Sequence, residues 1–476
     1  MTKIRPVRVT GVLCAMLVAG LTGASGAWGA AAPETGTQSG AWLFVSPSGS
    51  DAATGSRSAP LRTPQVAVDR LGAGGGTVVL ASGKYARARI VLTDKHHVTV
   101  TADHDAVPVL DATGLTPPDG QSGVVQITDG DRITVHGLTI TGYRTRATAP
   151  MPIGIYVTGA AKHVSLTGNH VHHLGNDNPT LGSFDMNAHG IAVYGRNPTS
   201  SVSDLTIAGN EVDHLVLGAS ESVVVNGNVD GWAITGNAIH DDNNIGIDAI
   251  GYEPTLPGPA RYTDANRARH GVIARNTITA IVSEGNPSYF EDGQWCNCAD
   301  GVYVDGGKSI AIDHNTVTRA DIGIEVAAED GKGKADEVAV TGNTVTASRY
   351  VGLAMGGYDT ERGEAYDVRV TGNTFRGNNT LRDGSPEILL QYYLHQVTIT
   401  GNSVTATNAD TPNLVQRDAL AGDAARNADV VLDRNDYGAP VPAARAGFVW
   451  LGQPVTGFPA WRTASGQDAH STYARR

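Results

Sequence analysis

The 476-residue sequence contains few cysteines, few aromatic residues and few charges. Because it has only three cysteines, disulfide bonds cannot be the main framework of the fold. Charged residues make up 17% of the chain and acidic residues outnumber basic ones by 47 to 35, which argues against the clustered basic surface of a general nucleic-acid binder. Beyond the N-terminal segment, no apolar run is long enough to span a membrane. The hydrophobic share of 41% is nevertheless sufficient for a sizeable core.

The N-terminal segment has the pattern of an export signal. Basic residues up to Arg8 precede an apolar stretch from Val12 to Leu21, and small residues follow. We expect residues 1–31 to be a signal peptide, residues 32–40 to be a flexible linker, and the protein to be secreted and extracellular. After removal of the signal we expect no membrane association and a monomer.

Two cysteines remain after the signal segment, Cys296 and Cys298, spaced C-x-C. A disulfide across one intervening residue is geometrically demanding, yet the export route permits it, and the sequence leaves both redox states open. Without nearby histidine ligands, the two thiols do not indicate a structural zinc site.

The most informative feature is an internal repeat, in which an alternating apolar strand ends in Gly-Asn or a close variant. The spacing between repeats varies from 27 residues (Asn210 to Asn237) to 41 residues (Asn169 to Asn210). The longer spacings indicate either an inserted loop or an additional degenerate turn. The repeated asparagines are Asn169, Asn210, Asn237, Asn276, Asn315, Asn343, Asn373, Asn402 and Asn435.

Strict alternation of apolar and polar residues predicts strands with one buried face. No helical periodicity of useful length separates these strands, which excludes a βαβ arrangement. The pattern therefore predicts an all-β, right-handed parallel β-helix, a solenoid in which each coil pairs with the next. We expect the repeated asparagine to adopt the left-handed turn itself and to form an amide ladder from coil to coil.

A solenoid needs caps at both ends, where apolar core and unpaired edges would be exposed. We expect the β-helix over residues 41–440, with an amphipathic helix from Pro64 to Leu71 covering its first coil. Residues 441–476 leave the repeat, and we expect them to form an irregular capping tail that folds back on the last coil.

Three segments carry a resemblance to a known group of proteins. The opening Phe44-Val-Ser-Pro-Ser-Gly-Ser-Asp51, the Gly-Thr-Val-Val-Leu-Ala-Ser-Gly-Lys-Tyr85 strand and the Gly-Asn coils together resemble secreted right-handed parallel β-helix proteins of the pectate-lyase-like superfamily. The ending Gly466-Gln-Asp-Ala-His-Ser471 is similar to the tail of many such polysaccharide-degrading proteins. The resemblance implies a fold rather than a reaction, because this architecture hosts lyases, hydrolases, epimerases and tail spikes.

Ionisable residues gather on the outward face of one set of strands. Aligning the Gly-apolar-x-apolar strands gives an outward column of Ala192, Asp248, Tyr303, Glu325, Ala354 and Leu389, with Asp305 and Gln391 two residues further along their strands. Coils about 4.8 Å apart would place Asp248 and Glu325 about 10 Å apart, and Asp305 and Glu325 about 8 Å apart. Such separations suit paired-carboxylate glycoside hydrolysis, so we predict Glu325, Asp305 and Asp248 as catalytic residues.

Asp305 and Asp300 also have a structural interpretation, whereas Glu325 and Asp248, at the centres of their strands, do not. Asp305 could cap the turn at Gly306, and Asp300 before Gly301 is ordinary turn chemistry. Ala299-Asp300-Gly301 and Asp321 also resemble the pattern of calcium-dependent β-helix lyases, which makes Asp300 and Asp321 candidate metal ligands.

Two long insertions, over residues 253–270 and 283–300, flank the acidic column and are predicted to form the walls of a groove. Aromatic residues near them could stack on sugar rings, although packing within the loops explains any single one. The predicted substrate-binding residues are Tyr303, Tyr252, Trp295, Gln391, Tyr392 and Tyr358.

The leading functional hypothesis is a glycoside hydrolase acting on an extracellular polysaccharide or its oligosaccharides, with no cofactor required. The first alternative is a Ca²⁺-dependent polysaccharide lyase. It needs a basic residue for proton abstraction, but the outward column contains no lysine. The second alternative is a non-catalytic carbohydrate-binding surface protein. The acidic net charge of −12 favours neutral over polyanionic glycans, and nucleic acid is not expected as a partner.

Overall fold

The computed structural model describes residues 40–419 and 429–476, which belong to one compact unit over residues 39–476. The predicted signal peptide, and the predicted linker up to residue 39, lie outside the described residues. No helix in the described part of the chain is both long and apolar enough to cross a membrane.

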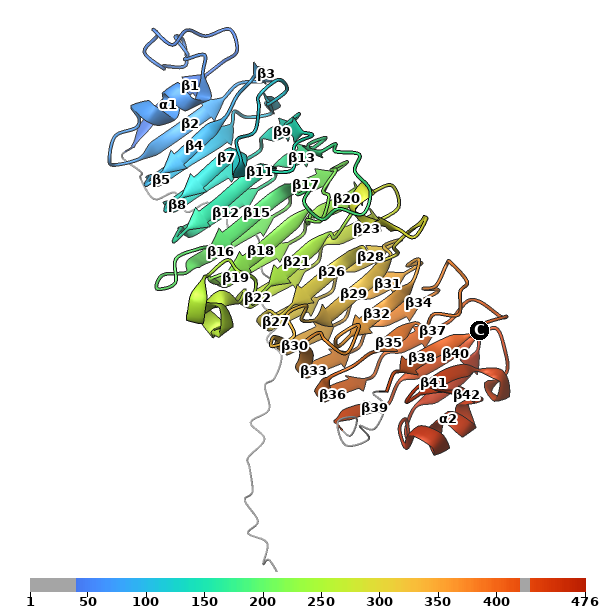
Figure 1. Cartoon of the computed structure of the whole chain (residues 1–476). Coiled ribbons are helices and arrows are strands. Elements are labelled where there is room, and N and C mark those ends of the chain that lie inside the picture. Colours follow the sequence, from blue (N-terminus) through green and yellow to red (C-terminus); the bar gives the residue numbers. More distant parts are fainter. Residues whose placement is uncertain (1–39, 420–428) are drawn as a thin grey trace, which may run out of the picture. The chain divides into compact units, whose positions relative to one another are not determined.

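In the described part of the chain, three sheets of 13 strands each make up most of the fold (Figure 1). The first sheet contains β1 (Ala41–Val45), β2 (Gly76–Leu80), β5 (His96–Ala102), β8 (Asp131–His136), β12 (Lys162–Thr167), β16 (Val202–Ala208), β19 (Val229–Thr235), β22 (Arg269–Ala274), β27 (Lys308–Asp313), β30 (Lys334–Thr341), β33 (Glu364–Thr371), β36 (Leu394–Thr400) and β39 (Val430–Asp433).

The second sheet contains β4 (Ile90–Thr93), β7 (Gly120–Thr128), β11 (Pro150–Gly159), β15 (His189–Gly195), β18 (Val223–Gly227), β21 (Ile247–Ile250), β26 (Asp300–Asp305), β29 (Ile322–Ala327), β32 (Val351–Met355), β35 (Ile388–Leu390), β38 (Asn413–Arg417), β41 (Gly447–Trp450) and β42 (Gln453–Thr456). The third contains β3 (Gly83–Ala86), β6 (Pro108–Asp111), β9 (Thr139–Thr141), β13 (His170–His172), β17 (Glu211–Asp213), β20 (Ala238–Asp242), β23 (Thr277–Ile281), β28 (Thr316–Thr318), β31 (Thr344–Thr346), β34 (Thr374–Arg376), β37 (Ser403–Thr405), β40 (Asp436–Ala439) and β43 (Thr472–Arg475).

Neighbouring strands of these sheets come from successive coils and pair in parallel, except for the antiparallel pair β41 and β42. The inward apolar residues of all three sheets form one continuous core, which includes Ile312, Val326 and Val345 from neighbouring strands. The predicted right-handed parallel β-helix is therefore confirmed, and the alternation of buried and exposed residues along the strands is its cause.

The predicted asparagine ladder is present between the first and third sheets. The Asn237 amide and backbone N–H both donate to Oδ1 of Asn276 at 2.9 Å, and Asn276 does the same to Asn315 at 2.9–3.0 Å. Each amide also donates to a strand carbonyl one coil back, such as that of Ile207. Because successive asparagines bond directly, every spacing corresponds to one coil, and the long spacings contain inserted loops.

The expected left-handed conformation belongs to a different residue of the repeat. The residue before each asparagine has positive φ, for example 63° at Gly236, 55° at Arg275 and 52° at His314. The asparagines themselves are not among the positive-φ residues. Glycine is common at this preceding position because it adopts the left-handed region without steric cost.

The N-terminal cap is α1 (Pro64–Arg70), whose Ala67 and Val68 are buried against the first coil. At the other end, the segment predicted to be irregular has regular structure. It contains β41 and β42, the helix α2 (Phe458–Ser465) and β43, which adds one more parallel strand beside β40. Trp461 of α2 is fully buried, so this segment closes the core.

Short elements occupy the loops between coils. Two-residue strands pair β10 (Arg144–Thr145) with β14 (Gly175–Asn176), and β24 (Phe290–Glu291) with β25 (Gln294–Trp295) in a hairpin. Short 3₁₀ helices cover Gly258–Tyr262, Asp264–Asn266, Pro287–Tyr289 and Ala443–Arg445.

Candidate active site

The second sheet presents the outward column that the sequence predicted. Asp248 pairs with Tyr303, Tyr303 with Glu325, and Glu325 with Ala354. Asp248 and Glu325 are thus two coils apart, as predicted. One coil was missing from the prediction, because Val224 of β18 lies between Ala192 and Asp248.

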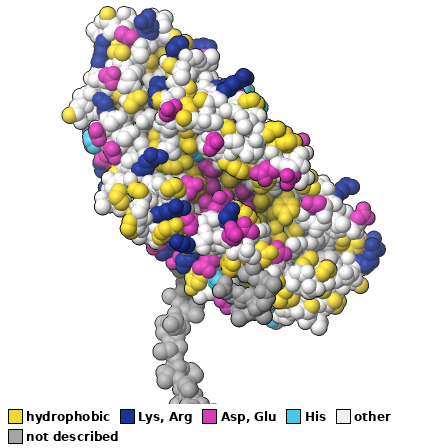
Figure 2. All heavy atoms as spheres, viewed as in Figure 1, with side chains coloured by type: hydrophobic (Ala, Val, Ile, Leu, Met, Phe, Trp, Pro, Cys, Tyr) yellow, Lys and Arg dark blue, Asp and Glu magenta, His cyan; other side chains and the backbone are white. Residues whose placement is uncertain are grey.

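A cavity of about 540 Å³ opens over this column. Acidic and apolar side chains gather in the hollow on this face (Figure 2). The lining comprises Phe184, Ile245, Tyr289, Glu291, Cys296, Asn297, Cys298, Asp300, Tyr303, Ile322, Glu325, Glu329, Tyr350, Ala354, Tyr358, Asp383, Leu389 and Gln391.

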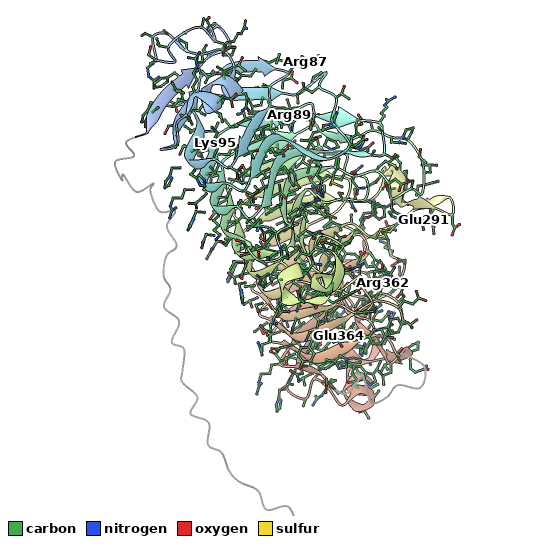
Figure 3. All side chains as sticks on the ribbon, turned by 60° about the vertical axis from the view of Figure 1, so that its left-hand side comes forward. Arg87, Arg89, Lys95, Glu291, Arg362 and Glu364 are labelled. Carbon is green, nitrogen blue, oxygen red and sulfur yellow. A yellow bond between two sulfur atoms is a disulfide. The ribbon has the colours of Figure 1, made fainter. Side chains whose placement is uncertain are left out.

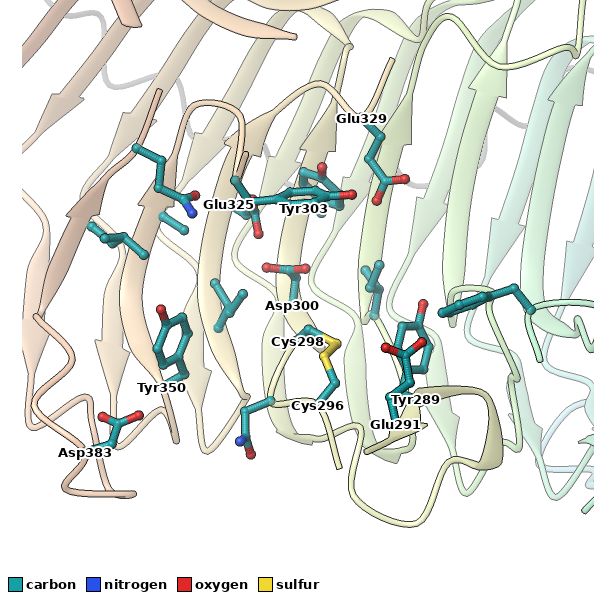
Figure 4. A pocket seen from close by; sticks show the side chains of 18 residues that line it. Tyr289, Glu291, Cys296, Cys298, Asp300, Tyr303, Glu325, Glu329, Tyr350 and Asp383 are labelled. Carbon is teal, nitrogen blue, oxygen red and sulfur yellow. A yellow bond between two sulfur atoms is a disulfide. The ribbon is translucent and has the colours of Figure 1, made fainter. Parts of the chain in front are cut away.

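Two carboxyl groups in this cavity, those of Asp300 and Glu325, lie next to each other (Figure 4), and each shifts the pKa of the other. Their side chains are 3% and 6% exposed, and burial raises both pKa values, that of Glu325 to about 7. The charge of Glu325 raises the pKa of Asp300 further, whereas the interaction with Asp300 opposes the rise at Glu325. Both raised pKa values favour a protonated carboxyl in this pair at neutral pH.

Asp300 reaches the cavity because the strand alternation is interrupted at Gly301. A Cβ atom at Gly301 would lie 2.5 Å from the Val317 side chain, so this position faces the core and accepts only glycine. The residue before it consequently lies on the outer face, as do Ile245 and Ile322 at equivalent positions in neighbouring coils. The predicted column began after each glycine and for this reason did not include Asp300 beside Glu325.

Asp305 and Asp248, predicted as catalytic partners of Glu325, do not line the cavity. Asp305 accepts a hydrogen bond from the backbone N–H of Glu329 at 2.7 Å, which fixes the start of the loop after β29. Asp248 is 2% exposed, and its Oδ1 has no hydrogen-bond partner. Burial raises the pKa of both carboxyls well above the usual value, and neighbouring carboxylates add to the effect.

Glu329 is a cavity residue that the sequence did not reveal. Figure 4 shows it on the opposite side of Tyr303 from Glu325. Burial and the charge of Glu253 raise its pKa, while Arg362 opposes that rise. The alternating pattern ends at Ala327, so no periodicity could place a loop residue two positions later.

Three of the predicted substrate-binding residues, Tyr303, Gln391 and Tyr358, line the cavity, whereas the other three do not. The Trp295 ring packs on Phe290 within the hairpin, with centroids 4.6 Å apart. The Tyr252 ring lies 5.1 Å from the Arg267 guanidinium, and the Tyr392 backbone bridges to Gly357. Tyr289, from the insertion over residues 283–300, and Tyr350 provide further aromatic lining.

The insertion over residues 283–300 forms one wall of the cavity, as predicted, with Glu291 at the outer end of its hairpin (Figure 3). Cys296 and Cys298 are joined as a disulfide in this wall. Asp321, predicted as a metal ligand, holds the wall in place instead. It accepts hydrogen bonds from the Ser283 N–H at 2.7 Å, the Ser283 hydroxyl at 2.6 Å and the Ala299 N–H at 3.2 Å.

The other insertion, over residues 253–270, contributes to a second cavity of about 300 Å³ on the same face. Glu221, Tyr194 and Arg196 line it together with Glu253. Burial raises the pKa of Glu221 well above its usual value, and Glu253 and Glu329 add to this rise.

The predicted calcium ligands, Asp300 and Asp321, do not belong to any set of three closely spaced donors among the described residues. Among residues 40–419 and 429–476, the sets of three donors from His, Cys, Asp or Glu within 4.8 Å of one another lie on the third sheet. The carboxyls of the cavity thus do not converge as the six to eight oxygen ligands of Ca²⁺ do, and we derive no step through a bound calcium ion.

Comparison with known proteins supports the fold. The A-module of the mannuronan C-5 epimerase AlgE4 from Azotobacter vinelandii has a TM-score of 0.53 and 15% identity, covering 86% of this chain and 94% of its own. The GH136 lacto-N-biosidase from Eubacterium ramulus has a TM-score of 0.51 and 12% identity, covering 91% of this chain and 67% of its own. At these identities the likeness shows a shared fold only.

One curated relative is much more similar in sequence. No protein-family model matches the chain. The uncharacterized protein YwoF from Bacillus subtilis (strain 168) is 34% identical over 441 residues, which cover 92% of this chain and 88% of the relative. The chain belongs to the same family as Bacillus subtilis YwoF.

Proposed function

We propose that the protein cleaves glycosidic bonds by hydrolysis, in the cavity on the second sheet. The observation that carries the proposal is the buried pair of neighbouring carboxyls, Asp300 and Glu325, in the larger cavity, whose raised pKa values favour a retained proton at neutral pH. Hydrolysis of a glycosidic bond requires such a protonated carboxyl to donate to the leaving oxygen.

The second requirement is a carboxylate on the other side of the scissile bond. Glu329 is the candidate, because it lines the same cavity and lies across Tyr303 from Glu325 (Figure 4). Asp300 would give its proton to the leaving oxygen as the glycosidic bond breaks. Glu329 would take a proton from the attacking water, or would first bond to the sugar and release it to water. Both routes yield a new reducing end.

The surroundings of the pair favour a carbohydrate substrate. Tyr289, Tyr303, Tyr350 and Tyr358 line the cavity and offer ring faces and hydroxyl groups to sugars. The fold is shared with proteins whose names describe a mannuronan epimerase and a lacto-N-biosidase. The second cavity, on the same face, offers room for further sugar units of an oligosaccharide or polysaccharide.

Charge favours a neutral glycan over a polyanionic one. Glu221 lines the smaller cavity, and Asp300, Glu325 and Glu329 line the larger one. A uronate bound beside them would bring another anion to groups whose raised pKa values already disfavour negative charge. For residues 40–419 and 429–476, the lining of the larger cavity includes no lysine or arginine that could abstract a proton beside a uronate carboxylate. This favours hydrolysis over the lyase alternative.

A product assay on a panel of neutral and acidic polysaccharides tests the proposal. We expect new reducing ends without the ultraviolet absorbance of an unsaturated uronate, and no gain in activity when Ca²⁺ is added. Glu325→Gln and Asp300→Asn should each lower turnover by about 100-fold to 10,000-fold while retaining substrate binding. Glu337→Gln, at an exposed position on β30 of the first sheet and outside the cavity lining, is the matched control and should retain full turnover.

Three outcomes would contradict the proposal. An unsaturated product would identify a lyase, and activity that depends on added Ca²⁺ would point to a calcium-dependent reaction. Binding of a glycan without turnover by the unmodified protein would identify a non-catalytic binding protein.

A further inference from the structure

A second cluster of chemically reactive side chains lies on the third sheet and has no part in the proposed hydrolysis. Three consecutive strands, β13, β17 and β20, pair in parallel there. Their register places His172 beside Asp213 and Asp213 beside His240, and it places His170 beside Glu211. Metal-ligating residue types therefore occupy adjacent positions on three neighbouring coils.

The residues that directly follow two of these strands extend the cluster. His173 and His214 both have φ 52°, so the backbone turns in the same left-handed conformation after both strands. Their rings consequently stack, with centroids 4.9 Å apart and planes 6° from parallel. Two imidazoles from different coils are thus held in a fixed relative orientation by the backbone.

Asp213 connects the histidines. Its Oδ1 lies 2.6 Å from His170 Nε2, and its Oδ2 is hydrogen-bonded to His214 Nδ1. The Asp213 side chain is 8% exposed, whereas that of His214 is 50% exposed. The carboxylate is therefore buried beneath imidazoles that remain accessible to an ion from solvent.

We propose that His173, Asp213 and His214 bind a divalent transition-metal ion such as Zn²⁺. One donor atom from each of the three residues lies within 4.8 Å of the others. Two imidazole nitrogens and one carboxylate oxygen are donors that Zn²⁺ uses, and the fourth position would be taken by water. Ca²⁺ binds through oxygen ligands, so a site with two imidazole nitrogens should bind Zn²⁺ in preference to Ca²⁺.

A second set of three donors, from His170, Glu211 and Asp213, shares the same aspartate. We assign the ion to the first set because it contributes two imidazoles rather than one. His170 then keeps the role it has in the structure, a hydrogen-bond partner to the other oxygen of the ligating carboxylate. Such a partner orients the carboxylate toward the ion.

The location suggests what the ion would stabilise. The backbone continues from His173 through β14 into the segment of residues 177–188, and Phe184 of that segment lines the larger cavity. The Arg144 side chain donates to the His173 carbonyl at 3.0 Å and pairs with Asp177 at 2.6 Å. A bound ion would therefore fix the start of a segment that forms part of the cavity wall.

Titration calorimetry with Zn²⁺ on the full chain, purified without a polyhistidine tag, tests the proposal. We expect one saturable site, no comparable binding of Ca²⁺, and a higher melting temperature with Zn²⁺. His173→Asn and His214→Asn remove the imidazoles, and asparagine tolerates the left-handed backbone at both positions. Each should weaken Zn²⁺ binding by at least the roughly 10–100-fold seen when an outer-shell partner of a metal site is removed.

The matched control is His314→Asn. His314 is also an exposed histidine with positive φ, but it lies on a more distant coil and pairs with Asp313. Zn²⁺ affinity should not change in this variant. The proposal is overturned if the unmodified protein binds Zn²⁺ more weakly than about 1 mM, or if the two cluster variants bind it as well as the control does. Circular dichroism of each variant separates loss of the site from loss of the fold.

Discussion

Two regions of the β-helix stack polar side chains from coil to coil, and they differ in chemistry. In the asparagine ladder, each side chain offers an amide donor and a carbonyl acceptor, so that Asn237, Asn276 and Asn315 satisfy one another. On the outer face of the second sheet, the stacked groups include the carboxyls of Asp248, Asp300 and Glu325. Ionised carboxylates only accept hydrogen bonds, so two neighbouring carboxyls can bond to each other only if one of them is protonated.

Burial does not account for the difference. Asn276 is 1% exposed, and Asp248, Asp300 and Glu325 are 2%, 3% and 6% exposed. The amides of the ladder nevertheless do not titrate. On the outer face, by contrast, the pKa of Glu325 rises to about 7, and one oxygen of Asp248 lacks a hydrogen-bond partner among the described residues. Register alone thus creates either a stabilising spine or a group of reactive acids, and the side-chain type decides which.

The largest effect should follow from placing carboxyl chemistry into the ladder. In Asn276→Asp, the two amide hydrogen bonds to the Ile234 carbonyl and to Asn315 Oδ1 are lost, and a carboxyl is buried among acceptors. We expect a loss of at least about 3 kcal/mol in the free energy of unfolding at neutral pH. Chemical denaturation at equilibrium measures it.

Asn276→Ala and Asn408→Ala complete this experiment. The alanine at 276 also leaves both donors of Asn237 without their acceptor, and we expect a similar loss. Asn408 is a half-buried loop residue whose side chain bonds to Thr411 and to the N–H of Asp410, so its substitution should cost no more than about 1 kcal/mol. If all three variants lose equally little, the ladder does not stabilise the fold.

The reverse exchange, an amide in place of a buried carboxyl, should have a smaller and pH-dependent effect. Burial raises the pKa of Asp242 to about 8, far above the roughly 3.9 of an unfolded chain. The native state then keeps a proton that the unfolded state has lost, so stability falls as pH rises toward 8. Between about pH 6.5 and pH 8.5, the free energy of unfolding of Asp242→Asn should fall by about 2 kcal/mol less than that of the unmodified protein.

The local contacts of Asp242 make this a clean substitution. Asp242 Oδ1 accepts from the Leu215 N–H at 2.8 Å and would do so as an amide oxygen. The Ser222 hydroxyl, which donates to Oδ2 at 2.6 Å, can turn to accept from the new amide. Melting temperatures at the two pH values measure the effect, with the exposed Asp292→Asn as control. An unchanged slope in Asp242→Asn would show that this carboxyl is ionised in the native protein.

The same contrast explains what the sequence could predict. The ladder repeats with every coil, so Asn276 and its counterparts stand out by spacing, and they fix the fold. The column of Asp248, Tyr303 and Glu325 could also be read, since it follows the strand alternation. Asp300 and Glu329 could not be placed beside Glu325, because one depends on the interrupted alternation at Gly301 and the other lies in a loop. Three-dimensional contacts, not periodicity, position those two side chains.

The smallest effect concerns the C-terminal end of the ladder, where no further asparagine follows Asn435. There the backbone N–H of Asn435 donates to Ser471 Oγ at 2.9 Å, and that hydroxyl donates to Asp468 at 2.6 Å. The capping tail thus supplies the acceptor that the next coil would have supplied. Ser471→Ala should cost about 1–2 kcal/mol in the free energy of unfolding, less than an internal rung, because one hydroxyl is lost there rather than an amide with both its donors and its acceptor. Thr472→Ala, at an exposed neighbouring hydroxyl, should cost less than about 0.5 kcal/mol in the same denaturation experiment. Equal costs for Ser471→Ala and Asn276→Ala would mean that a single acceptor accounts for each rung and that the amide donors add nothing.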